Sequence, residues 1–181
     1  MPDELARTLL SEQQIRVRVA DMAAEIDADY AGRDLLLIGV LKGAVMLTAD
    51  LARALEHTNV EMDWTSVSSY GSGSTTSGVV RMLKEPDSDI AGRHVLLVED
   101  TTDSGLTLAW LLENLRARGA ASVEICTLLR KPELALVEVA VRYVGFDIPP
   151  EFVVGYGLDY AQRYRTLPYI AVLAPHVYAT S

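Results

Sequence analysis

Apolar residues along the chain form short continuous runs, and segments with helical spacing separate them. The runs at residues 35–40, 95–98 and 122–129 have the length of strands, and their unbroken apolar character is typical of parallel strands buried on both faces. Segments with apolar positions three or four apart predict helices between them. The first helix follows a capping-box pattern at Ser11 and Gln14 and ends near Gly32. This alternation predicts an α/β fold, a mainly parallel twisted sheet flanked by helices.

Other segments have different patterns. Residues 60–64 alternate apolar with polar side chains, which predicts a strand with Asp63 on a solvent-facing side. The Gly/Ser/Thr-rich stretch 71–78 follows, and residues 79–83 are predicted to return as the second strand of a hairpin. Composition makes the stretch equally compatible with an exposed loop and with a lid over a binding site. A last strand is expected near residues 169–173.

Length and composition limit the classes of protein. The 181 residues, half of them hydrophobic, predict one globular domain over residues 1–181. A net charge of −9 argues against nucleic acid as the main partner. The absence of a long apolar run or a signal peptide predicts no membrane partner, and the lone Cys126 in an apolar run is expected to be buried. These features favour a cytoplasmic protein.

The densest group of polar residues follows the strand at 95–98. Glu99 and Asp100 come directly after it, Asp103 follows, and a Ser-Gly turn then opens a helix. Carboxyl ends of parallel strands bind ligands in open α/β sheets, and free amides at a helix N-terminus bind anions. Helix capping explains any one of these acids but not three whose repulsion costs stability without a ligand or metal. The pattern therefore indicates a sugar phosphate.

The acidic net charge complicates phosphate binding, because the field of the protein repels anions. A cation held by carboxylates would compensate, and Mg²⁺ typically binds through one or two carboxylates together with substrate phosphates. The sequence has no Walker-type phosphate loop and no histidine spacing suited to zinc. The acidic segment is thus the main candidate site, with Mg²⁺ as its expected cofactor.

Four motifs in order resemble the hypoxanthine-guanine phosphoribosyltransferases of the type I phosphoribosyltransferase family. They are Leu41-Lys42-Gly43, Ser69-Tyr70-Gly71, the acidic segment 99–107 and residues 152–160. The resemblance implies a purine-salvage enzyme that moves phosphoribose from phosphoribosyl pyrophosphate to a 6-oxopurine base, giving a nucleoside monophosphate (IMP or GMP) and pyrophosphate. It also implies a core over about 33–141, a hood from the N-terminal segment and about 142–181, and a homodimer or homotetramer. The apolar stretch 136–139 is a candidate subunit contact.

The same resemblance implies a role for individual residues. Asp103 would be the general base on a purine ring nitrogen. Glu99 and Asp100 would hold the ribose hydroxyls directly or through Mg²⁺, and Asp159 a second Mg²⁺. The ribose and its phosphate would be bound by Glu99, Asp100, Thr101, Thr102, Asp103, Ser104, Gly105, Leu106 and Thr107.

The remaining implied residues lie outside the acidic segment. Pyrophosphate would be bound by Leu41, Lys42, Gly43 and Arg165, and in this family the peptide between the first two can be cis. The purine would be bound by Lys131, Phe152, Val153 and Asp159, with Lys131 donating to the 6-oxygen and Phe152 stacking on the base. Ser69 and Tyr70 would belong to the lid.

Two alternatives stay open at this point. One is an enzyme that prefers xanthine or another base, and the other is a regulator that binds phosphoribosyl pyrophosphate or nucleotide without turnover. The presence of Asp103, Lys131 and Asp159 together favours an enzyme.

Overall fold

A six-stranded sheet forms the body of the molecule in the computed structural model, which describes residues 3–56, 59–69 and 80–179. Its strand order is β4-β3-β2-β5-β6-β7, and every neighbouring pair is parallel except β3 and β4. The strands are β2 (Asp34–Val40), β3 (Asn59–Ser69), β4 (Val80–Lys84), β5 (His94–Thr102), β6 (Ser122–Arg130) and β7 (Tyr143–Asp147). The predicted mainly parallel α/β sheet is confirmed.

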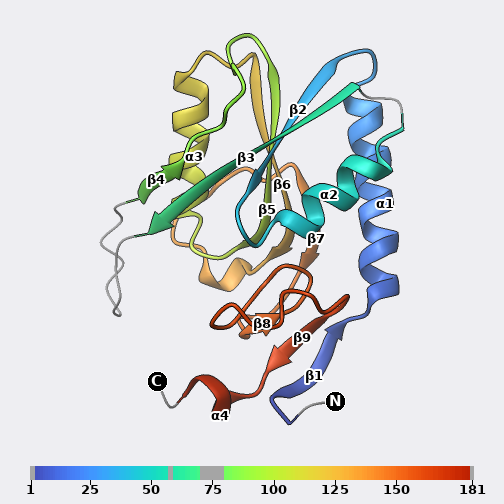
Figure 1. Ribbon diagram of the computed structural model, residues 1–181, viewed down its shortest axis with the longest axis vertical. Coiled ribbons are helices and arrows are strands. Elements are labelled where there is room, and N and C mark those ends of the chain that lie inside the picture. The colour runs from blue at the N-terminus through green and yellow to red at the C-terminus, as the bar shows by residue number, and fades with distance from the viewer. Residues whose placement is uncertain (1–2, 57–58, 70–79, 180–181) are drawn as a thin grey trace.

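Helices cover both faces of this sheet (Figure 1). On one face α1 (Glu12–Asp29) and α2 (Val45–Ala54) pack on one apolar cluster, and on the other α3 (Leu106–Ala117) packs on a second. The predicted capping box is present, because Ser11 Oγ accepts from the Gln14 amide at 3.2 Å and Gln14 Oε1 accepts from the Ser11 amide at 2.9 Å. No helix in the described part of the chain has both the length and the apolar character needed to cross a bilayer.

A small antiparallel sheet lies at one end of the molecule beside both termini (Figure 1). Its order is β1-β9-β8, with β1 (Leu5–Leu10), β9 (Ile170–Leu173) and β8 (Val153–Val154), and the short helix α4 (Pro175–Tyr178) follows. We call this sheet with α4 and the loop 155–169 the hood. The sequence patterns did not predict β1. The main sheet also extends past residue 141, because β7 pairs with β6 and buries Tyr143.

The predicted orientation of β3 is wrong. Asp63 and Thr65 are buried, whereas Met62 is 43% exposed. The Asp63 carboxylate accepts hydrogen bonds from the amides of Trp64 and Ser88, both at 2.7 Å. Because backbone donors satisfy the carboxylate, a polar residue takes an inward position that the alternation alone assigns to solvent.

Candidate active site

The end of β5 and the start of α3 enclose a cavity of about 190 Å³. Its lining contains all but one of the residues predicted to bind ribose and phosphate. The exception is Leu106, which opens the first turn of α3 and does not line the cavity, whereas Leu108 does. The lining residues are Glu99, Asp100, Thr101, Thr102, Asp103, Ser104, Gly105, Thr107 and Leu108.

The loop before α3 contacts the segment 136–137 of the same chain. Gly105 has a φ of +80°, and a Cβ at this position would lie 2.9 Å from the Val137 carbonyl oxygen. The amides of Leu136 and Val137 donate to the Ser104 carbonyl oxygen at 3.0 and 3.2 Å. The stretch 136–139, a candidate subunit contact, therefore supports the loop from within the chain, although Leu136 is 68% exposed.

The two adjacent carboxylates at the end of β5 repel each other in a buried setting. Burial and then the charge of Asp100 raise the pKa of Glu99 well above its ordinary value. Burial raises the pKa of Asp100 to about 6, although the Thr101 amide and the charge of Arg165 act in the opposite direction. Neither carboxylate forms a salt bridge with a described residue. The pair can therefore accept a cation or hydroxyl groups at this cavity.

Among the described residues, the adjacent carboxylates of Glu99 and Asp100 fit magnesium better than Asp159 does. In the described residues no group of three or more metal-ligating side chains occurs. A magnesium ion held by Glu99 and Asp100 would take its other ligands from water and substrate oxygens, as is usual for this ion. Asp159 fits less well, because its two oxygens already bind Arg165 Nη2 at 2.7 Å and the Gln162 amide at 2.8 Å.

Two glycines let three distant segments meet at this edge of the sheet. The Leu41–Lys42 peptide is cis, and it directly precedes Gly43. A Cβ on Gly43 would lie 1.6 Å from Asp100 Oδ2, and a Cβ on Gly157 would lie 2.0 Å from the Gly43 carbonyl oxygen. The loop after β2 is thus in van der Waals contact with the acidic strand end on one side and with the hood on the other.

The basic residues predicted to bind pyrophosphate are held in the same region. Lys42 Nζ donates to Gln162 Oε1 at 3.1 Å, and Arg165 Nη2 donates to the same oxygen at 3.1 Å. Arg165 also donates from Nη1 to the Gly157 carbonyl oxygen at 2.7 Å. The structure therefore brings Lys42 and Arg165 together. Gln162 was missed in the sequence, because a neutral amide among charged residues gives no signal of charge or periodicity.

Asp103, the predicted general base, and Lys131, the predicted hydrogen-bond donor to the purine, form an ion pair. Lys131 follows β6, is 8% exposed, and places Nζ 3.3 Å from Asp103 Oδ1. The Lys131 amide donates to the Thr102 carbonyl oxygen at 3.0 Å, which joins the ends of β5 and β6. Thr101 Oγ1 donates to Asp103 at 3.3 Å. Lys131 thus lies at the boundary of the acidic cavity, within reach of Asp103.

The predicted stacking residue sits in a group of aromatic side chains in the hood. Phe152 is 39% exposed and stacks on Tyr178 of α4 with ring centroids 5.1 Å apart and planes 22° apart. Tyr160 meets it edge-on at 5.8 Å. Val153 is buried in β8, opposite Val172 of β9. Tyr178 was missed in the sequence, because a single aromatic residue near a chain end has no pattern around it.

Comparison with known proteins agrees with this geometry. The family model "Phosphoribosyl transferase domain" matches residues 6–161. The chain is 52% identical to the hypoxanthine-guanine phosphoribosyltransferase of Mycobacterium tuberculosis, over 98% of this chain and 90% of the relative, and 47% identical to that of Bacillus subtilis, over 98% of each. A crystal structure of a hypoxanthine phosphoribosyltransferase from Staphylococcus aureus superposes with a TM-score of 0.93 at 41% identity, covering 97% of this chain and 95% of that chain.

The chain belongs to the hypoxanthine-guanine phosphoribosyltransferases, within the type I phosphoribosyltransferase family.

The predicted lid of this phosphoribosyltransferase falls largely outside the described residues. Ser69 is the last residue of β3 and pairs with Val80 of β4, so the hairpin strands are present on both sides. Tyr70 and the stretch 71–78 lie in the part of the chain that the structure does not describe. The lid assignment of Ser69 and Tyr70 therefore stays a prediction.

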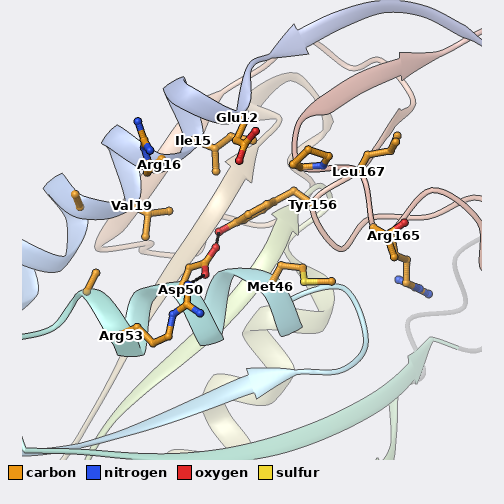
Figure 2. A pocket seen from close by; sticks show the side chains of 14 residues that line it. Glu12, Ile15, Arg16, Val19, Met46, Asp50, Arg53, Tyr156, Arg165 and Leu167 are labelled. Atoms are coloured by element: carbon orange, nitrogen blue, oxygen red, sulfur yellow. Dashed lines mark hydrogen bonds and ion pairs between the residues drawn. The ribbon is translucent and has the colours of Figure 1, made fainter. Parts of the chain in front are cut away.

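A larger cavity of about 630 Å³ lies between α1, α2 and the hood of the phosphoribosyltransferase (Figure 2). Tyr156 of the hood donates to Asp50 of α2 at 2.7 Å within it, and Figure 2 shows Arg165 at its rim, extended away from that pair. Of the predicted site residues that the structure describes, only Arg165 lines this cavity. It is therefore separate from the cavity at the acidic strand end.

Proposed function

We propose that the chain transfers the 5-phosphoribosyl group from phosphoribosyl pyrophosphate to hypoxanthine or guanine, giving IMP or GMP and pyrophosphate in purine salvage. The observation that carries the proposal is the contact between Asp103 Oδ1 and Lys131 Nζ at 3.3 Å. On a 6-oxopurine, N7 and the 6-oxygen are neighbours that need a proton acceptor and a proton donor. A carboxylate and an ammonium group this close can serve both atoms at once.

The acidic end of β5 would bind phosphoribosyl pyrophosphate, the donor of the phosphoribosyl group. Glu99 and Asp100 accept hydrogen bonds from the ribose 2′- and 3′-hydroxyls, and the 5′-phosphate lies at the N-terminus of α3, whose first amides have no intrahelical acceptor. When bound by Glu99 and Asp100, Mg²⁺ would neutralise negative charge on the donor and its leaving group. Lys42 and Arg165 supply fixed positive charge for the pyrophosphate.

The base would bind between Lys131 and the hood. Lys131 donates to the 6-oxygen, and it rejects adenine because the 6-amino group is itself a donor. Phe152 offers the ring face that Tyr178 leaves open, and the main chain of Val153 bonds the base edge. In the reaction a bond forms between purine N9 and C1 of ribose, the C1–oxygen bond to pyrophosphate breaks, and Asp103 accepts the proton from N7.

Three further expectations belong to the same proposal. The hairpin at Ser69 and Tyr70 would close over the site and keep water from the reacting sugar. The enzyme would assemble as a homodimer or homotetramer, supported by the exposed Leu136. A cytoplasmic location is supported by the lone buried thiol of Cys126, since this chain has no second cysteine for an internal disulfide.

A spectrophotometric assay tests the function directly. The purified protein is mixed with phosphoribosyl pyrophosphate, Mg²⁺ and one base at a time: hypoxanthine, guanine, xanthine or adenine. We expect turnover of hypoxanthine and guanine and little or none of adenine. Xanthine as the best substrate would favour a xanthine-preferring enzyme, and adenine as the best would remove the role of Lys131. Binding of phosphoribosyl pyrophosphate without turnover of any base would identify a regulator.

A further inference from the structure

Gln162 occupies a central position between the two basic residues at the pyrophosphate end of the site. Its Oε1 accepts from Lys42 Nζ and from Arg165 Nη2, both at 3.1 Å. Lys42 lies 120 residues earlier, directly after the cis peptide, so this contact joins the loop after β2 to the hood. One neutral oxygen therefore holds two cations that would otherwise repel each other.

The backbone around Gln162 is built to present this side chain. Gln162 has a φ of +66° and Ala161 of +50°, a conformation that residues other than glycine rarely adopt. The Gln162 amide donates to Asp159 Oδ2 at 2.8 Å, and the other oxygen of that carboxylate binds Arg165. Asp159 thereby fixes both the turn that carries Gln162 and the guanidinium that Gln162 contacts.

We infer that Gln162 is a positioning residue for pyrophosphate, which holds Lys42 and Arg165 side by side before the donor binds. This inference rests on the proposed function, because it assigns the two cations to the pyrophosphate group. An amide accepts both hydrogen bonds and leaves both positive charges in place for the leaving group. Because the cations are already in position, less side-chain freedom is lost when phosphoribosyl pyrophosphate binds or pyrophosphate departs.

The test compares three variants with wild type. Gln162→Met keeps the length of the side chain and removes the acceptor, and Gln162→Glu keeps an acceptor oxygen. Arg163→Ala is the matched control on the same loop, because Arg163 pairs with Glu4 at 3.1 Å on the exposed surface. For each protein we measure kcat, KM for phosphoribosyl pyrophosphate and for hypoxanthine, the inhibition constant of pyrophosphate, and the melting temperature.

We expect Q162M to raise the KM for phosphoribosyl pyrophosphate and the inhibition constant of pyrophosphate by about 5- to 20-fold, as loss of hydrogen bonds to two charged groups implies. Its KM for hypoxanthine and its melting temperature stay close to wild type. R163A stays within about threefold of wild type in every constant, whereas Q162E, whose negative charge offsets the charges of Lys42 and Arg165, also raises both the donor KM and the pyrophosphate constant. An unchanged or lowered pyrophosphate constant in Q162M, or equal loss of hypoxanthine binding, would overturn the inference. An inactive wild-type protein would instead overturn the proposed function.

Discussion

The acidic end of β5 and the hood are assembled from the sequence in different ways. The cavity at the end of β5 is lined by residues within one stretch, from Glu99 to Leu108. The hood side collects Lys131 after β6, Phe152 before β8 and Tyr178 in α4, from separate parts of the chain. A local strand–turn–helix unit thus forms the proposed ribose and 5′-phosphate part of the donor site, whereas the proposed base site exists only after the chain has folded.

This difference separates two properties of the enzyme, binding of the phosphoribosyl donor and choice of the purine base. Binding of the ribose and 5′-phosphate of the donor depends on groups fixed within one loop, whereas base choice depends on contacts between segments that can vary independently. Substitutions in the acidic stretch should therefore change donor binding or chemistry for every base alike. Substitutions at Lys131, Phe152 or Tyr178 should change one base relative to another and leave the donor nearly unaffected, whereas Arg165 and Gln162 of the hood belong to the pyrophosphate end of the donor site.

The largest effect is expected at Asp103, where the two regions meet. Asp103→Asn removes the proton acceptor, so kcat should fall by about 10²- to 10⁴-fold, while the dissociation constant of phosphoribosyl pyrophosphate changes by less than about threefold. Steady-state kinetics and calorimetry measure the two quantities. Asp147→Asn is the control, because this acid pairs with Arg130 at 2.6 Å at the end of the next strand. A D103N enzyme with the wild-type rate would show that Asp103 is not the base.

The next effect concerns base choice through Lys131. Lys131→Met removes the donor to the 6-oxygen, so KM for hypoxanthine should rise by about 10- to 100-fold, in keeping with a hydrogen bond from a charged group. The preference for hypoxanthine over adenine, measured as the ratio of kcat/KM values, should fall by a similar factor. Arg130→Met tests whether any neighbouring cation has this effect. A preserved ratio in K131M would place base selection elsewhere.

The buried carboxylates of the acidic stretch predict a pH dependence of donor binding. Burial raises the pKa of Asp100 to about 6. Below pH 6 the free enzyme carries a protonated Asp100, which binds hydroxyls and magnesium poorly, so KM for the donor should rise by up to about tenfold per pH unit. KM for hypoxanthine should change less. Kinetics between pH 5 and pH 8 check this, and a flat donor KM would mean that Asp100 is ionised throughout.

The same carboxylate should limit the stability of the ligand-free fold. Its folded pKa lies above that of the unfolded chain, so its stabilising contribution is full below about pH 4 and is lost as the pH rises through 6. Asp100→Asn should therefore raise the melting temperature at pH 8 by about 3 °C, equivalent to on the order of 1 kcal/mol, and by less at pH 5. Thermal denaturation at both pH values measures the difference. An equal gain at both would point to packing instead of charge.

The smallest effect is expected at Tyr178, whose ring packs on the face of Phe152 opposite the proposed purine site. Tyr178→Leu removes the ring stacked on Phe152, and an aromatic pair of this kind is worth about 0.5–1.5 kcal/mol. KM for hypoxanthine and guanine should rise by about 2- to 10-fold, with donor KM unchanged. Tyr169→Leu, on the same side of the molecule, is a control for loss of a hood tyrosine. Equal changes in both constants would show that α4 supports the whole site.

The sequence predicted the main sheet and the acidic site better than it predicted the hood. Continuous apolar runs predicted the inner strands, because strands covered on both faces have a one-dimensional signal. The prediction of which face of β3 meets solvent was wrong. The buried Asp63 carboxylate accepts hydrogen bonds from backbone amides, which no local pattern reveals. The strand β1 was missed, because it pairs with β9 more than 150 residues later. Gln162 was missed for the same reason, because its contact with Lys42 joins residues 120 positions apart.

The most direct test of the two-region account is calorimetric titration of phosphoribosyl pyrophosphate with Mg²⁺ into three proteins. They are wild type, Asp100→Asn in the acidic stretch and Phe152→Ala directly before β8 of the hood. D100N should weaken donor binding by at least about tenfold, whereas F152A should stay within about twofold of wild type. Equal weakening in both variants, or loss only in F152A, would contradict the assignment of donor binding to the acidic end of β5.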